Sequence, residues 1–302
     1  MNASTAFVVY VSLSVLVLAP LGLGLLVWLR RRPAVAPRGA WDGALSLNSG
    51  LIYAFSFGLI FFIQELFLVW PKALTPGLRP TLFHNNHHWS GDNPLAELLQ
   101  GTGALAILLT AMIFSAWLKW RPPQSATMRL FVLWTAFHGY FQSLPQVVVG
   151  SVLPQNDVGM ALHYLQLGLP VRLSLAMIAL VLIVILATGF ARPLLELAAR
   201  PGDVATPARR AGFMLRTATL PALLALPVIV AMRVPGSWDQ VAIVPVAEFV
   251  IGMCWLQAAA ALVRPRSTGM ALAAGPAWGA AAAVVAQLLI FQFALRPGIA
   301  FY

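Results

Sequence analysis

Charged side chains are scarce in this 302-residue sequence. Only 9% of its residues are Asp, Glu, Lys or Arg, and acidic residues account for just 9 positions. A typical soluble domain carries about 25% charged residues. Hydrophobic residues make up 60% of the chain, and its mean hydropathy is +0.83. This balance excludes an ordinary soluble domain and indicates a membrane protein.

Cysteine and the common catalytic motifs are also nearly absent. Cys254 is the single cysteine, so the chain cannot form an internal disulfide or a cysteine-based zinc site. We expect Cys254 to be a small buried hydrophobe. The sequence has no GxSxG motif, no P-loop and no GxGxxG opening a helix. Serine-nucleophile and nucleotide-binding functions therefore have no support from motifs.

Long apolar runs, in contrast, recur along the whole chain. A hydrocarbon core about 30 Å thick requires ~20 apolar residues in each helical span. The qualifying windows are about 7–29, 45–70, 96–118, 130–152, 159–190, 217–232, 240–262 and 270–294. The window at 217–232 is short, which leaves seven spans as the alternative. The sequence therefore predicts an all-α, polytopic transmembrane helical bundle of about eight spans.

The net charge of +10 is distributed unevenly between the two sides of the predicted bundle. If the spans alternate, most basic residues fall on one side: Arg30, Arg31, Arg32, Arg38, Lys119, Arg121, Arg129, Arg192, Arg200, Arg209, Arg210, Arg216, Arg264 and Arg266. Loops rich in Lys and Arg stay cytoplasmic. We therefore expect both termini to be extracytoplasmic in a bacterial inner membrane, with the basic residues facing lipid head groups instead of nucleic acid.

The polar residues divide the chain into unequal parts. Residues 1–190 form a predicted five-span half that holds all 5 histidines. Residues 191–216 form a predicted basic cytoplasmic loop, and residues 217–302 a three-span supporting half. The small-residue run in the last span is typical of close helix packing in lipid.

The stretch 81–92, "TLFHNNHHWSGD", places three histidines in the loop after the second span. Several Pro and Gly residues between 71 and 94 predict an irregular segment or short strands. Imidazole is a good ligand for zinc and other transition metals. The candidate metal ligands are His84, His87, His88, His138, His163 and Asp157. A solvated loop that binds nothing and a proton relay are the alternatives.

Ionisable residues also occur inside the predicted spans. Glu65, His138, Arg172 and Glu248 lie at membrane depth, where such groups normally face a cavity or a partner. Arg172 requires a carboxylate, and Glu248 and Glu65 are the candidates. We expect an intramembrane ion pair between Arg172 and Glu248, either structural or within a substrate or ion path.

Three segments resemble site-2-protease-type intramembrane zinc metalloproteases in their order. They are "IQELFLVWPKAL" at 63–74, "LLQGTGALAILL" at 98–109 and "SLPQVVVGSVLPQNDVGMALHYL" at 143–165. In that family HExxH supplies two zinc-binding histidines and a general base, and a later Asp is the third ligand. The resemblance assigns Glu65 to the catalytic base and Asp157 to the third ligand. Gln64 and Leu68 replace the two histidines, so the resemblance does not supply the family's usual zinc site.

Three functions follow as hypotheses. The first is a metallohydrolase-like membrane enzyme with an outward-facing zinc or other transition-metal site. The second is a catalytically inactive scaffold or chaperone that binds another membrane protein. The third is a transporter or channel with an intramembrane Glu/Arg/His path.

Overall fold

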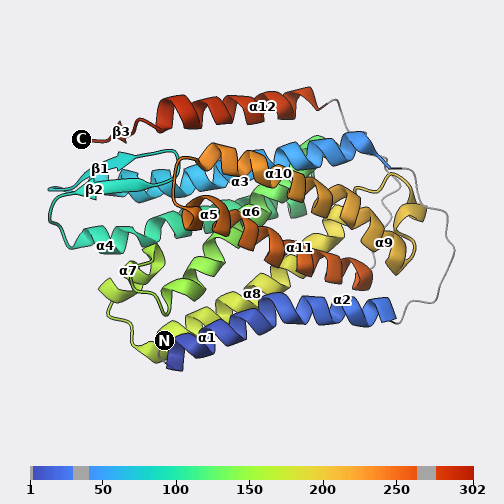
Figure 1. The fold of residues 1–302 in the computed structure, drawn as a ribbon, viewed down its shortest axis with the longest axis horizontal. Helices are drawn as coiled ribbons and strands as arrows, with labels where there is room; N and C mark the ends of the chain where they lie inside the picture. The colour runs from blue at the N-terminus through green and yellow to red at the C-terminus, as the bar shows by residue number, and fades with distance from the viewer. Residues whose placement is uncertain (1–2, 30–40, 264–276) are drawn as a thin grey trace.

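The computed structural model describes residues 3–29, 41–263 and 277–302, and it is an all-α bundle of long helices (Figure 1). Within these residues, 7 helices are long and apolar enough to cross a membrane. The prediction of a polytopic helical membrane protein is therefore confirmed.

The first part of the chain, up to Tyr164, contains both long strands of the small sheet and half of the long helices, counting α6. Its elements are α1 (Ala3–Leu13), η1 (Ser14–Leu18), α2 (Ala19–Leu29), α3 (Gly43–Ala73), β1 (Arg79–Leu82), β2 (His87–Ser90), α4 (Leu95–Leu99), α5 (Gly101–Trp120), α6 (Ala126–Gly150) and α7 (Asp157–Tyr164). The remaining elements are α8 (Leu169–Leu195), η2 (Pro201–Val204), α9 (Pro207–Met214), η3 (Leu215–Thr219), α10 (Leu220–Arg233), η4 (Asp239–Ile243), α11 (Val244–Leu262), α12 (Trp278–Leu289), η5 (Ile290–Leu295) and β3 (Ile299–Ala300).

Two predicted spans differ from their windows in length or hydropathy. The window at 217–232 lies in a 27-residue helical stretch from Pro207 to Arg233, because α9 forms within the predicted basic loop. The helix α6 has 25 residues but is absent from the set of sufficiently apolar helices, since its sequence carries polar residues at most turns. Counting α6 gives eight long helices, as the sequence windows suggested.

The predicted span 159–190 is divided. Its first part is the short helix α7, and α8 begins only at Leu169. Gln166 has a φ of 53° in the intervening turn, and Pro170 lies in the first turn of α8. Proline favours the start of a helix because its missing N–H would have no helical acceptor there. Residues just after the break therefore lie at the end of a span.

The two ends of the bundle differ in character. One end, called the hairpin end below, holds β1, β2, α4, α7 and both chain termini (Figure 1). The opposite end, called the basic end, holds α9 and the described basic residues Lys119, Arg121, Arg129, Arg192, Arg200, Arg209, Arg210 and Arg216. The basic residues that the sequence places on one side of the membrane thus lie at the same end of the bundle. Arg30, Arg31, Arg32, Arg38, Arg264, Arg266 and the beginning of the last predicted span lie outside the described residues.

Short strands occur in the histidine loop, as its prolines and glycines predicted. β1 pairs antiparallel with β2, and β3 near the C-terminus pairs antiparallel with the other edge of β1. Gly91 has a φ of 110°, and a Cβ there would meet the carbonyl oxygen of Gly77. Asn85 in the hairpin turn donates to the carbonyls of Arg233 and Pro235, at 2.9 and 2.7 Å. The hairpin is therefore fastened to the end of α10.

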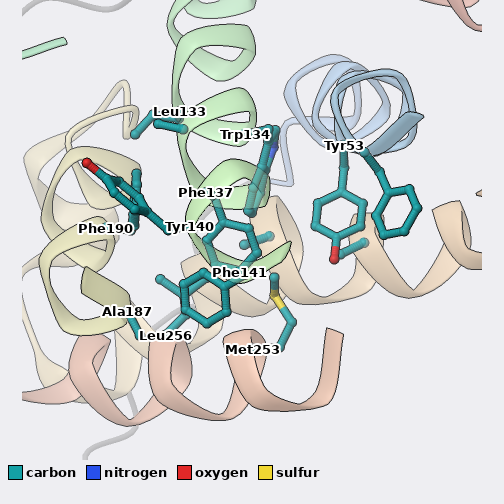
Figure 2. Close-up of a cluster of buried hydrophobic side chains, with 14 of the residues drawn as sticks. Tyr53, Leu133, Trp134, Phe137, Tyr140, Phe141, Ala187, Phe190, Met253 and Leu256 are labelled. Atoms are coloured by element: carbon teal, nitrogen blue, oxygen red, sulfur yellow. The ribbon is translucent and has the colours of Figure 1, made fainter. Parts of the chain in front are cut away.

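Aromatic rings fill the centre of the bundle (Figure 2). Tyr53 and Trp134 meet edge to face with centroids 5.0 Å apart, and Phe137 stacks on Phe141 at 4.2 Å. Met253 and Leu256 of α11 belong to the same buried cluster. The core thus combines residues from the two proposed halves, 1–190 and 217–302.

Helices α5 and α6 approach each other closely at Gly139. A Cβ at this position would lie 2.7 Å from both the Ala111 Cβ and the Ile107 carbonyl oxygen. We expect Gly139→Ala to destabilise the protein by about 1–3 kcal/mol, because the interface has no room for a methyl group. Thermal unfolding in detergent provides the measurement.

Gly189→Ala is the matched control, because a Cβ at Gly189 has nothing within 4 Å. Alanine should be neutral or slightly stabilising in that helix. Equal unfolding temperatures for the two variants would contradict the close α5–α6 contact.

Candidate functional site

A buried polar stripe runs along α3 from the basic end to the hairpin end. Its members recur every three or four residues, with gaps, and therefore share one helix face. Ser46, Ser49, Tyr53, Ser56, Gln64 and Lys72 are all buried, and Asp42 caps the start of the helix. Side-chain hydroxyls along the stripe bond to neighbouring helices: Ser49 donates to the carbonyl of Thr217 and accepts from Trp134 Nε1. The stripe supplies polar groups toward both ends of α3, with a gap at the apolar Ile60 between Ser56 and Gln64.

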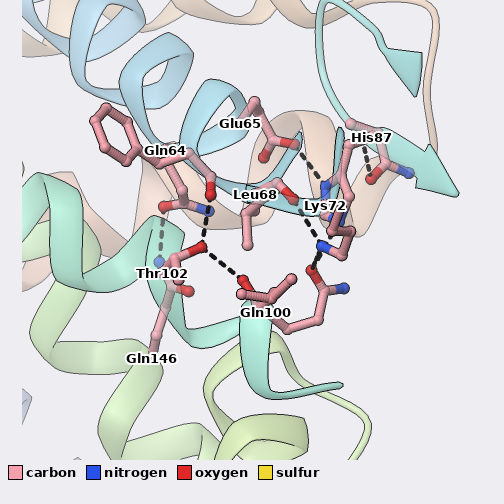
Figure 3. Close-up of polar contacts among 11 residues, drawn as sticks. Gln64, Glu65, Leu68, Lys72, His87, Gln100, Thr102 and Gln146 are labelled. Atoms are coloured by element: carbon pink, nitrogen blue, oxygen red, sulfur yellow. Dashed lines mark hydrogen bonds and ion pairs between the residues drawn. The ribbon is translucent and has the colours of Figure 1, made fainter. Parts of the chain in front are cut away.

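Four buried side chains meet at the hairpin end of this stripe (Figure 3). His87 Nδ1 lies 2.9 Å from Glu65 Oε2, and His87 Nε2 lies 2.9 Å from Gln100 Oε1. Lys72 Nζ donates to the same Gln100 oxygen and to the Leu68 carbonyl, each at 2.7 Å. Lys72 is 0% exposed. We call Glu65, Lys72, His87 and Gln100 the hairpin-end centre.

The hydrogen bonds of this centre determine where protons are held. An ammonium group only donates, so the Gln100 atom that faces Lys72 must be the carbonyl oxygen. The same oxygen accepts from His87, so Nε2 of His87 carries a hydrogen. Nδ1 faces a Glu65 carboxyl oxygen, and this contact requires one more proton, on either the imidazole or the carboxyl group. The Glu65–His87 pair is neutral in both arrangements and shares one proton.

Asp157 and Trp89 border the centre. The Trp89 ring lies 4.8 Å from Lys72 Nζ and stacks on His87 at a centroid distance of 5.8 Å. Asp157, half-buried at the start of α7, lies within electrostatic range of Lys72, His87 and Glu65. Burial raises the pKa of the Asp157 carboxyl, and the charge of Glu65 adds to the rise, while His87 and Lys72 oppose it. Asp157 is therefore the partly exposed acid of the group.

A second histidine–glutamate pair lies deeper in the bundle. His138 of α6 is 0% exposed, and its Nδ1 lies 2.5 Å from Glu248 Oε1 of α11. Its Nε2 lies 3.0 Å from the Tyr53 carbonyl oxygen. A carbonyl only accepts, so Nε2 of His138 must carry a hydrogen. The Glu248–His138 pair therefore repeats the arrangement of Glu65 and His87, with one proton shared between imidazole and carboxyl.

The candidate metal ligands do not converge on one point. Within residues 3–29, 41–263 and 277–302, no group of three or more His, Cys, Asp or Glu side chains is arranged to hold a metal ion. His87 faces inward on β2, whereas the next residue, His88, faces solvent, because successive strand residues point to opposite faces. His84 is buried near the end of α10, and His163 is exposed on α7. Three of the predicted site residues do lie near one another: His87 contacts Glu65, and Asp157 lies within electrostatic range of both.

Arg172 and Glu248 have different surroundings from those predicted. Glu248 pairs with His138, and Arg172 lies in the first turn of α8. The reason is the break between α7 and α8, which moves Arg172 from the predicted middle of a span to its hairpin end. The predicted ion pair between these two residues does not occur among the ion pairs of the described residues.

Sequence reasoning missed three contributors to the site. No role was predicted for Lys72 or Arg233, and the α3 stripe was not recognised. Its signal was present, since Asp42, Ser46, Ser49, Tyr53 and Ser56 recur at helical spacing in an apolar run. The burial of Lys72 had no such signal, because it depends on the hairpin folding back over α3.

His84 supplies a pH-dependent contribution to stability. Burial lowers its pKa below the ordinary value of 6.5, and the guanidinium groups of Arg296 and Arg233 act in the same direction, against the carbonyls of Arg233 and Val234. As the pH falls, His84 is therefore protonated at a higher pH in the unfolded chain than in the folded protein. The stability contributed by neutral His84 is fully present above a pH of about 6.5 and is lost as the pH falls from there through the lower pKa of the folded state.

We expect the wild-type unfolding temperature to fall between about pH 7.5 and pH 5, by ~2–4 °C more than that of His84→Asn. His88→Asn should retain the wild-type pH dependence, because its side chain faces solvent. Identical pH profiles for His84→Asn and the wild type would contradict the buried, neutral state of His84.

The chain has no match in comparisons with protein-family models, curated proteins and solved structures. The resemblance to intramembrane zinc proteases therefore stays a prediction from the sequence. The function must be inferred from the geometry of the two histidine–glutamate pairs.

Proposed function

We propose that the protein moves protons across its membrane along the polar stripe of α3. The observation that carries this proposal is the repeated arrangement of His87 with Glu65 and His138 with Glu248. In each pair the Nε2–H group donates a hydrogen bond to an amide or backbone carbonyl oxygen. One further proton is shared between Nδ1 and a carboxyl group. Chains of Asp, Glu and His inside membrane segments are typical of proton relays.

The positions of the two histidine–glutamate pairs support a route on which each pair binds the proton in turn. Gln142 and Gln146 follow His138 at four-residue intervals on α6, and Gln146 donates to Gln64 Oε1 at 2.8 Å. Polar groups thus lie between the Glu248–His138 pair and the hairpin-end centre. Hydroxyl-bearing residues continue the stripe from Tyr53 to the basic end. Asp157 gives the hairpin-end centre a partly exposed acid.

The charge distribution supports an orientation for this route. The basic end faces the cytoplasm under the positive-inside rule, so Asp157 and the hairpin lie outside. A proton entering at Asp157 would reach the Glu65–His87 pair first and the Glu248–His138 pair second. In a bacterium, the inner membrane is the membrane that this charge asymmetry favours.

Proton flux into liposomes tests the proposal. We expect purified wild-type protein to acidify the lumen under an imposed potassium diffusion potential, measured with a trapped pH-sensitive dye. Glu248→Gln should reduce the flux at least about tenfold, because the amide cannot hold the shared proton. His87→Gln should have a similar effect at the hairpin end.

His163→Gln is the matched control, because His163 is exposed and outside both pairs. This variant should conduct like the wild type. Wild-type flux equal to that of protein-free liposomes, for a protein confirmed as folded, would contradict proton movement.

A catalytically inactive relative of intramembrane zinc proteases is the second candidate, and one observation favours it. Glu65 and Asp157, the two positions carried over by the resemblance, lie within electrostatic range of Lys72. The buried ammonium supplies positive charge beside the acids, where the family would place a metal ion. Such a protein would bind another membrane protein without cleaving it.

Metal content separates both candidates from the metallohydrolase hypothesis. We expect detergent-purified protein to contain less than about a tenth of an equivalent of zinc, iron or copper, because three ligands plus water are needed for a catalytic zinc site. Removing two imidazoles with His87→Ala and His88→Ala should leave this value unchanged. Stoichiometric metal that is lost in this double variant would restore the enzyme hypothesis.

A further inference from the structure

A buried arginine lies between the two histidine–glutamate pairs. Arg233, the last residue of α10, is 4% exposed, and its guanidinium carbon lies 4.0 Å from the centroid of the Phe61 ring. Its Nε and Nη2 donate to the Gln240 carbonyl oxygen, at 3.1 and 2.6 Å. The aromatic face and the carbonyl therefore hold the cation in place.

Because the Arg233 guanidinium lies over the Phe61 ring, the position of Phe61 in α3 shows how far along that helix the guanidinium lies. Phe61 lies four residues before Glu65 and eight residues after Tyr53, whose carbonyl binds His138. At 1.5 Å per residue, these separations are about 6 and 12 Å along the helix axis. Arg233 also lies within electrostatic range of both Glu65 and Glu248. Its charge therefore acts on both pairs.

Three buried polar atoms around this region have no protein partner. They are Arg233 Nη1, Tyr53 Oη and Glu248 Oε2. Both Tyr53 and Arg233 lie within electrostatic range of Glu248. Buried polar groups without protein partners are normally satisfied by internal water.

We propose that Arg233 is an electrostatic gate on the proton route, acting through the charge of its buried guanidinium group. The inference rests on the proposed function. A proton that arrives from Asp157 adds one positive charge, first to the neutral Glu65–His87 pair and then to the neutral Glu248–His138 pair. The guanidinium opposes the cationic pair and slows the transfer. It also repels Na⁺ and K⁺, as fixed arginines do in other pores.

Replacing the charge tests the gate in the same liposomes. Arg233→Gln should raise proton flux at least about tenfold, whereas Arg233→Lys, which keeps the charge, should stay near the wild-type rate. Adding Glu248→Gln to Arg233→Gln should return the flux to background, because the route still requires the pair. Arg296→Gln serves as a control, since Arg296 is an exposed arginine at the same end.

The outcomes separate the gate from the proposed function. Wild-type flux that depends on Glu248 and does not rise in Arg233→Gln would overturn the gate and leave proton movement intact. Background flux in both the wild type and Arg233→Gln would overturn both. Raised flux that persists in the double variant would indicate a non-specific leak and overturn the gate.

A second variant tests the gate if Arg233→Gln fails to fold. Phe61→Leu removes the ring beneath the guanidinium but leaves every charge in place. We expect an increase in flux that is smaller than for Arg233→Gln and abolished by Glu248→Gln. No increase in a folded Phe61→Leu protein, together with an unfolded Arg233→Gln, would also overturn the gate.

Discussion

The fully buried contact between His138 and Glu248 is the interaction on which the interior of the bundle depends. It joins α6 to α11, and the second imidazole nitrogen joins α6 to the Tyr53 carbonyl of α3. Three helices therefore meet at one imidazole ring, which is surrounded by the aromatic rings of Tyr53, Phe57 and Phe137. Removing one partner of such a buried pair typically costs about 3–5 kcal/mol, because the other is left without compensation. The pair can remain buried because its two groups together are neutral.

The hairpin-end centre applies the same chemistry near the surface. Glu65 and His87 form a neutral pair, and the nearby charges of Lys72 and Asp157 have opposite signs. The hairpin covers this group, and its turn is tied to α10 through Asn85. Polar chemistry in this protein is thus concentrated on one face of α3 and on His138 of α6 and Glu248 of α11, which pack beside that face. A polar stripe with a proton-sharing pair at its middle and another at one end is the feature that distinguishes the fold from a simple packing bundle.

Local sequence information predicted the helices and failed for contacts between distant segments. Apolar windows identified the spans, and the prolines and glycines around the histidines indicated short strands. The histidine motif did not reveal which ring faces inward, because that depends on the strand register of His87 and His88. Glu248 was recognised as an intramembrane acid, but its pairing with His138 depends on how α6 packs against α11, which no local pattern specifies. Burial of Lys72 likewise depends on the hairpin returning over α3, which no local pattern specifies.

The central claim is that both imidazoles carry a hydrogen on Nε2 and share a proton with a carboxyl group through Nδ1. Solid-state NMR of ¹⁵N-histidine-labelled protein in lipid bilayers measures this directly, with single histidine variants to assign the signals. The account predicts protonated Nε2 at His87 and His138, and an Nδ1 signal shifted by a strong hydrogen bond to a carboxyl group. An unprotonated Nε2 at either residue would contradict it.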